Sequence, residues 1–155
     1  MAPPSVPPYV CAILRCVSSA CVLLESRPPE ARTAAGQLTC FGGKLEPAEQ
    51  PLQALLRELS EELGGWQPQT PPQRAVDLYV DGELIAWFYE APAPPRDLHI
   101  SYETGRIGLW VPIEQLSELP NLSPWHRVVL QAWQVGEDRA DFVTPPPAEN
   151  VPAPD

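Results

Sequence analysis

Residues 42–65 read GGKLEPAEQPLQALLRELSEELGG and place three glutamates, Glu58, Glu61 and Glu62, within five positions. Pro51 near the start of this stretch and Gly64 near its end predict a helix over residues 51–63. At about 100° per residue, the five leucines of the helix share one arc, and the three glutamates share another that is turned away from it. We expect the leucine face to be core and the glutamate face to be exposed or to line a cleft.

The positions of the three glutamates are electrostatically unfavourable in an isolated helix. Acidic residues in the last helical turn oppose the helix dipole, and like charges three or four residues apart repel each other. A solvated surface is the ordinary explanation for such a run of carboxylates, but it leaves the repulsion in place. A site for divalent cations removes it, and Mg²⁺ takes carboxylate oxygens as ligands while keeping waters and substrate phosphates in its shell. The pattern therefore favours a metal site over a solvated face.

The spacing of these residues resembles the Nudix box, G-x5-E-x7-R-E-U-x-E-E-x-G-U. The matching positions are Gly43, Glu49, Arg57, Glu58, Leu59, Glu61, Glu62 and Gly64. Only the last position differs, since Gly65 stands where the box has a bulky apolar residue and Trp66 follows one place late. On this match the chain is identified as a member of the Nudix hydrolase family, in its MutT-like form.

The resemblance implies a role for each residue of the box. Glu58 and Glu62 would be the main Mg²⁺ ligands, Glu61 would bind a second or shared ion, and Gly42 would offer its backbone carbonyl; Mn²⁺ is an alternative ion. Gly42 and Gly43 would let the backbone approach ions and phosphates closely. Arg57 and Glu49 would fix the loop to the helix, with Gly64 ending it. Lys44 is a phosphate contact in this scheme, although a solvated lysine fits its position equally well.

The resemblance also implies the reaction: hydrolysis of a nucleoside diphosphate linked to another group, X, by attack of water at phosphorus. Cations held by the box would neutralise the phosphates and activate water, with Glu58 and Glu61 among the catalytic groups. The general base is Glu58 or a carboxylate outside the box, for which we choose Glu103 in the segment SYETGRIGLW. A plain loop glutamate is an equally good interpretation of Glu103.

Outside the box, the sequence says less about X. The default is a nucleoside triphosphate, damaged or not, cleaved to a nucleoside monophosphate and pyrophosphate. Alternatives are a coenzyme A, dinucleoside polyphosphate or sugar-nucleotide pyrophosphatase, and a Nudix-fold module that binds a nucleotide as a sensor without turnover. Base-stacking candidates are Trp87, Tyr102 and Trp125, each of which also fits a core aromatic. Asn121 or Ser123 is expected to contact a base edge.

The order of predicted elements is strands, a helix, more strands and two terminal helices, with Asp81-Gly82 joining two strands as a hairpin. This order predicts an α/β (α+β) fold, and the resemblance implies a Nudix-type α/β/α sandwich with a mixed β-sheet between helices. We expect a flexible N-terminus over residues 1–8, the Nudix domain over 9–136, and a Pro-rich, acidic, disordered tail over 137–155. Deletion of residues after about 138 is expected to leave activity intact.

Composition limits the partners and the compartment. With 20 acidic and 10 basic residues the chain is not suited to bind a nucleic-acid polymer. The apolar run over residues 9–24 contains Arg15 and is interrupted, so we interpret it as two strands rather than a membrane segment. The four cysteines lack C-x-x-C spacing and are expected to be buried free thiols, as suits the cytoplasm. Dimers are common among similar domains, so a homodimer stays open.

Overall fold

The computed structural model describes residues 6–32 and 34–147. Within these residues the chain forms eight strands, two α-helices and one 3₁₀ helix. In chain order the elements are β1 (Tyr9–Arg15), β2 (Cys21–Ser26), β3 (Leu38–Thr39), β4 (Phe41–Lys44), α1 (Pro51–Glu62), β5 (Gln73–Val80), β6 (Glu83–Pro92), β7 (Ile107–Pro112), η1 (Ile113–Glu118), α2 (Pro124–Gln134) and β8 (Arg139–Phe142).

The sheet is mixed and is organised around β1. This strand pairs in parallel with β6 along its whole length, and on its other side it pairs antiparallel with β4 and then with β2. Across the N-terminal half of β1 the strands therefore follow the order β4, β1, β6, β5, β8. Asp81 and Gly82 both have positive φ, as a tight turn between β5 and β6 requires, and the predicted hairpin is confirmed.

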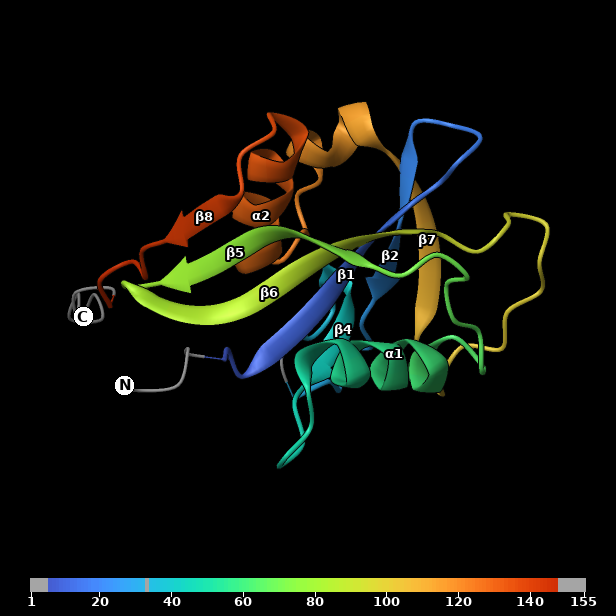
Figure 1. Ribbon diagram of the computed structural model, residues 1–155. Coiled ribbons are helices and arrows are strands. Elements are labelled where there is room, and N and C mark those ends of the chain that lie inside the picture. Colours follow the sequence, from blue (N-terminus) through green and yellow to red (C-terminus); the bar gives the residue numbers. More distant parts are fainter. Residues whose placement is uncertain (1–5, 33, 148–155) are drawn as a thin grey trace.

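The two α-helices lie on opposite faces of the sheet, which gives three layers (Figure 1). Side chains alternate along each strand, so one sheet supplies two cores. On β1, for example, Val10 and Ala12 belong to the core under α1, whereas Cys11 and Ile13 belong to the core under α2. The predicted α+β sandwich with a mixed sheet between helices is confirmed.

Helix α1 begins and ends where its sequence predicts. Pro51 occupies the first turn, and Gly64 follows the helix with φ of +63°. The N–H of Gly65 closes the C-terminus by donating to the carbonyl of Ser60 (2.7 Å). Leu55, Leu59 and Leu63 are buried and attach the helix to the sheet, which fixes the direction in which the glutamates project.

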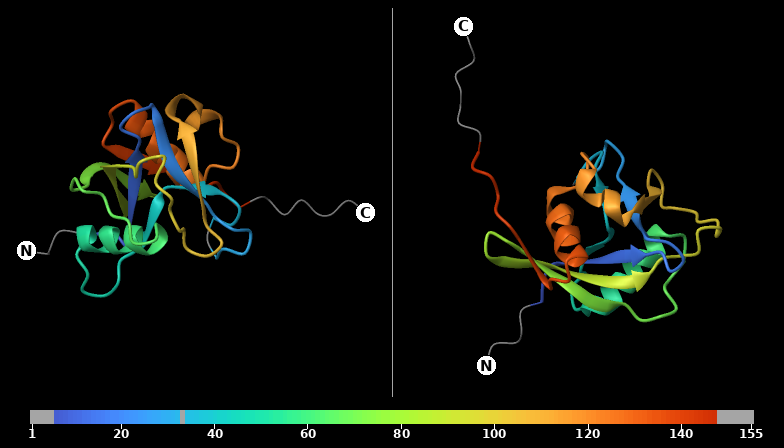
Figure 2. Two further views of the ribbon diagram at one scale, coloured as in Figure 1. Left: turned by 90° about the vertical axis from the view of Figure 1, so that its right-hand side faces the viewer. Right: turned by 90° about the horizontal axis from the view of Figure 1, so that it is seen from above.

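The predicted domain boundary at residue 136 is wrong. Residues 139–142 form β8, which pairs in parallel with the exposed edge of β5, and Ala140 is buried in the core under α2. β8 continues the sheet at this end, and the chain then leaves the domain (Figure 2). The sequence RADF is short and half charged, so its composition alone resembles that of a solvated tail. The backbone groups at the otherwise unpaired edge of β5 provide the hydrogen-bond partners that order it as a strand.

The described residues also extend the domain at its start. Pro7 is buried and the carbonyl of Pro8 accepts a hydrogen bond from the N–H of Leu45 (2.9 Å), so the expected flexible segment over 1–8 is wrong for these two residues. The rest of that prediction, for residues 1–5, and the prediction for 148–155 lie outside the described residues. Across residues 6–32 and 34–147, no helix is both long and apolar enough to cross a bilayer.

Candidate active site

The three glutamates of α1 differ in their exposure. The side chain of Glu61 is 53% exposed and that of Glu58 17%, so both face an open site, as expected. Glu62 is only 1% exposed, and for this residue the expected exposed or cleft-lining position is wrong. Its Oε1 accepts a hydrogen bond from the N–H of Gly42 (3.0 Å). Glu62 therefore ties the helix to β4 beneath the site.

Gly42 and Gly43 are needed for this close approach of β4. Gly42 has φ of +149°, and a Cβ there would lie 2.2 Å from the carbonyl oxygen of Val10 on the paired strand. Gly43 has no such backbone constraint, but its Cβ would lie 2.5 to 2.7 Å from the carboxylate atoms of Glu58. The first glycine lets the strands pair, and the second leaves room for the carboxylate of Glu58.

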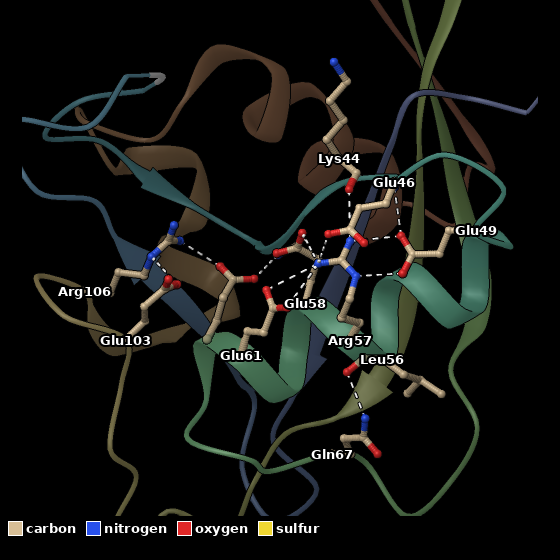
Figure 3. Close-up of polar contacts among 12 residues, drawn as sticks. Lys44, Glu46, Glu49, Leu56, Arg57, Glu58, Glu61, Gln67, Glu103 and Arg106 are labelled. Carbon is tan, nitrogen blue, oxygen red and sulfur yellow. Dashed lines mark hydrogen bonds and ion pairs between the residues drawn. The ribbon is translucent and has the colours of Figure 1, made fainter.

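Arg57 lies at the centre of the carboxylates (Figure 3). Its guanidinium holds Glu49 through two hydrogen bonds, Nε to Oε2 (2.6 Å) and Nη2 to Oε1 (3.0 Å), which keeps the pKa of that carboxyl below its usual range. The remaining nitrogen, Nη1, lies 3.0 Å from Oε1 of Glu58 and 3.3 Å from both oxygens of Glu61. Glu58 and Glu61 thus already share one positively charged centre.

A second arginine, Arg106, which the sequence analysis did not identify, pairs with the more deeply buried carboxylates. Arg106 Nη1 contacts Glu25 and lies 2.8 Å from Oε2 of Glu62, and its Nε lies 3.0 Å from Oε2 of Glu103. The loop that carries Glu103 docks on the end of α1, where the N–H of Glu103 donates to the carbonyl of Glu62 (3.2 Å). Glu25, on β2, is 1% exposed. The signal in the sequence was indirect: buried carboxylates need a cation, and Arg106 is three residues after Glu103.

Burial shifts the pKa values of Glu58 and Glu62 upward. Burial raises the pKa of Glu58, although the guanidinium of Arg57 opposes the shift. Burial, and then the nearby carboxylate of Glu25, raise the pKa of Glu62 to about 10, against the opposing charge of Arg106. Too few cations surround the carboxylates, and an added cation would be stabilised here.

The donor set fits a hard divalent cation. Glu58 and Glu61 converge on one nitrogen, Glu62 supplies a third carboxylate beneath them, and Gly43 leaves room for the carboxylate of Glu58. Within the ranges that the structure describes, no group of three or more His, Cys, Asp or Glu side chains is placed to hold a metal ion. Mg²⁺ does not require one, because it takes one or two carboxylates and completes its octahedron with waters and substrate phosphates. Glu58, Glu61 and Glu62 are the residues that could hold it.

A cavity of about 670 Å³ opens beside this cluster on the α2 face of the sheet. Gly42, Gly43, Lys44, Glu58 and Arg106 line it at the end near the carboxylates. The other walls are mostly apolar and aromatic: Leu78, Ile85, Phe88, Trp125, His126 and Phe142, together with Arg27 and Ser123. The cavity thus joins a highly charged end to an end suited to a flat, uncharged group.

Three titratable groups in the cavity wall are not suited to nucleophilic or acid–base chemistry. Burial raises the pKa of Cys40 to about 12 and the pKa of Cys11 well above its usual value, so both remain thiols. Burial lowers the pKa of His126 to about 4. Its Nδ1 accepts the N–H of Cys40 (3.0 Å), which leaves the ring proton on Nε2. His126 is therefore a neutral wall residue.

Some of the predicted substrate-binding residues line the cavity, and others do not. Lys44, Trp125 and Ser123 line the cavity. Trp87, Tyr102 and Asn121 are not among the described residues that line it, and these three predictions are wrong for this cavity. Trp87 alternates with Phe88, so its ring faces α1, where the Arg74 guanidinium covers it at 3.9 Å. Tyr102 packs against Phe41 on the same side.

Asn121 contributes a backbone contact between distant segments. Its carbonyl accepts a hydrogen bond from the N–H of Leu38 (2.9 Å). Ser123, two residues later, reaches the cavity instead. Glu103 also lies outside the cavity wall, at its Arg106 side.

The profile of the NUDIX domain family matches residues 6–133. Among solved structures, the chain is similar to the MutT protein from Methanosarcina mazei Go1, at 22% identity over 84% of this chain and 97% of that one, with a TM-score of 0.65. It is 26% identical to the MutT NUDIX hydrolase from Burkholderia pseudomallei, over 81% and 98% of the two chains, with a TM-score of 0.58. The E. coli ORF135 protein is 27% identical over 82% and 87%, with a TM-score of 0.53. No curated protein matches the sequence significantly.

Proposed function

The chain belongs to the NUDIX family as a MutT-like hydrolase, and from this premise we propose that it is a magnesium-dependent pyrophosphohydrolase of nucleoside triphosphates. Its products are a nucleoside monophosphate and pyrophosphate, formed by attack of water at phosphorus. Damaged nucleotides are included in this substrate class, and Mn²⁺ is the alternative ion. Four buried free cysteines favour a reducing compartment, and we place the enzyme in the cytoplasm.

The observation that supports this proposal best is the continuity of one cavity from the carboxylate of Glu58 to an aromatic wall. A nucleoside triphosphate has the same two ends, a chain of charged phosphates and a flat base. The phosphates suit the end lined by Glu58, Gly43 and Lys44, because cations held by the carboxylates would be shared with phosphate oxygens. The base suits Phe88 and Trp125, whose rings offer stacking surfaces.

The residues of the chain divide the work between binding and positioning. Glu58, Glu61 and Glu62 would bind the ion, and bound Mg²⁺ supplies Lewis-acid chemistry, neutralising phosphate charge and making water a stronger nucleophile. Arg57 orients Glu58 and Glu61 through Nη1. Arg106 and the N–H of Gly42 hold the buried carboxylate of Glu62 through one hydrogen bond to each of its oxygens.

Of the two carboxylates considered as general base, Glu58 is favoured over Glu103. Glu58 lines the cavity, where a water beside the bound phosphates would lie within its reach. Glu103 is held against Arg106 outside the cavity wall.

The test compares two glutamate-to-glutamine variants. Glu58→Gln is expected to lower kcat by about three orders of magnitude or more while thermal unfolding changes little. Glu46→Gln is the matched control, because Glu46 also approaches Arg57 (3.7 Å) but is 65% exposed and lies off the cavity. Activity of Glu58→Gln within a few-fold of the unaltered enzyme would refute the role of Glu58.

A substrate panel separates this proposal from its alternatives. The protein is incubated with Mg²⁺ and nucleoside triphosphates, dinucleoside polyphosphates, sugar nucleotides or coenzyme A. Products are separated by ion-exchange chromatography, and phosphate is measured with and without added pyrophosphatase. Phosphate that appears only with pyrophosphatase, from a nucleoside triphosphate, is the expected result. Tight nucleotide binding with no turnover of any compound would instead indicate a sensor module.

A further inference from the structure

The segment after α2 is fastened to the β5–β6 hairpin at several points. The N–H of Asp77 donates to the carbonyl of Asp138, and the N–H of Asp81 donates to the carbonyl of Phe142, both at 2.9 Å. Beyond the strand, the hydroxyl of Thr144 donates to Oδ2 of Asp81 (2.7 Å), and the N–H of Thr144 donates to Oδ1 (3.0 Å). Both ends of β8 are therefore held by side-chain or backbone hydrogen bonds.

The side chains of β8 alternate between solvent and the interior. Arg139 and Asp141 are exposed and pair with each other, and Arg139 covers the ring of Tyr79 at 3.8 Å. Ala140 and Phe142 point the other way: Ala140 is buried under α2, and Phe142 lines the cavity. β8 thus presents one aromatic side chain to the substrate site.

The position of Phe142 relative to the carboxylates follows from the strand order. The cavity floor crosses β4, β1, β6, β5 and β8, each of which contributes at least one lining residue. Neighbouring strands lie about 4.8 Å apart, so β8 lies about 19 Å across the sheet from β4. The charged residues Lys44 and Glu58 lie at the β4 end, whereas Leu78, Ile85 and Phe142 form an uncharged surface at the β8 end.

β8 lies beyond the part of the chain that the NUDIX profile matches, which ends at residue 133. We propose that this added strand completes the substrate cavity and that Phe142 contacts the nucleobase, so that the C-terminal strand helps to decide which nucleotide is accepted. This inference rests on the proposed function, because it takes the phosphates to lie at the Glu58 end. Phe142 is a specificity-determining residue and takes no part in hydrolysis.

The experiment measures binding without turnover. The probes are the α,β-imido analogues of the four common deoxynucleoside triphosphates, with Mg²⁺, and pyrophosphate as a probe that has no base. Phe142→Ala is expected to raise the Kd of the tightest analogue about tenfold and that of pyrophosphate less than about twofold, since stacking on an aromatic ring concerns the base alone. Val143→Ala is the matched control, because this neighbouring side chain is 76% exposed.

Phe142→Leu is made alongside, because it keeps an apolar side chain on β8 if Phe142→Ala loosens the strand. It is expected to weaken analogue binding less than Phe142→Ala, with a thermal unfolding midpoint like that of Val143→Ala. An unchanged Kd of the analogues in both Phe142 variants, or an equal weakening of analogues and pyrophosphate, would overturn this inference alone. Failure of the unaltered protein to bind any analogue would overturn the proposed function and this inference with it.

Discussion

The substitution Gly43→Ala tests the geometry of the site through a single methyl group. Gly43 lies on β4 beside the carboxylate of Glu58, and its φ is not in the left-handed region. Alanine can therefore adopt the backbone conformation of Gly43, and a glycine-to-alanine change at such a position commonly stabilises a protein by about 0.4 to 1 kcal/mol. The cost falls on Glu58 instead.

The size of the effect follows from the contact distances. The new Cβ would lie 2.5 Å from Cδ of Glu58, whereas ordinary van der Waals contact begins at 3.4 Å. The carboxylate must therefore withdraw by roughly 0.9 Å, and a misplacement of about 1 Å in a catalytic site can reduce the rate about 100-fold. We expect kcat to fall by about that factor while the free energy of unfolding is unchanged or slightly raised.

The assay pairs steady-state kinetics with urea unfolding of Gly43→Ala and Gly42→Ala. At Gly42 the new Cβ would lie 2.2 Å from a backbone oxygen of β1, so this variant is expected to lose stability. A Gly43→Ala enzyme with unaltered kcat would refute the placement of Glu58 against β4. Equal destabilisation in both variants would show that the two glycines serve folding alone.

Three further predictions concern the buried charges and β8. The folded pKa of Glu62 (about 10) exceeds the usual 4.5, so the metal-free protein binds a proton on folding. Its free energy of unfolding should therefore fall by up to about 1.4 kcal/mol per pH unit as pH rises between those values. Thermal unfolding in the presence of a chelator from pH 5.5 to 8.5 checks this, and a stability that does not change with pH would contradict it. Arg106→Leu leaves the carboxylate of Glu25 buried without its cation and should cost about 3 to 5 kcal/mol in urea unfolding, with Arg106→Lys less affected. A change below about 1 kcal/mol would argue against the pairing. Truncation after residue 136 removes β8 and should lower stability by about 2 kcal/mol or more, whereas an unchanged unfolding midpoint would show that β8 does not hold to β5.

The sequence predicts most reliably where a local pattern determines the structure. The leucine period and the Pro and Gly at its ends predict α1 to within one residue, because helix ends depend on neighbouring groups. Asp81-Gly82 predicts its hairpin for the same reason, since both residues tolerate positive φ. The spacing of the box likewise places Glu58 and Glu61 on one face of a helix.

What the sequence does not show depends on contacts between distant segments. The depth of Glu62 is set by β4, which lies 20 residues away, and its partner Arg106 comes from a loop 44 residues away. β8 is ordered by the free edge of β5 rather than by its own composition. Successive side chains of β6 point to opposite faces of the sheet, so Phe88 faces the cavity and Trp87 faces away from it. The cavity lies on the face that α2 covers, and this cannot be predicted from the sequence of β6 alone.

The most direct test of the account is calorimetric titration of Mg²⁺ and Mn²⁺ into the protein with an α,β-imido nucleotide present. We expect ion binding in the unaltered enzyme that is strongly weakened in Glu58→Gln and Glu62→Gln and retained in the control Glu46→Gln. Binding that is the same in all four proteins, or no ion binding at all with nucleotide present, would contradict the claim that the carboxylates of α1 hold a divalent cation.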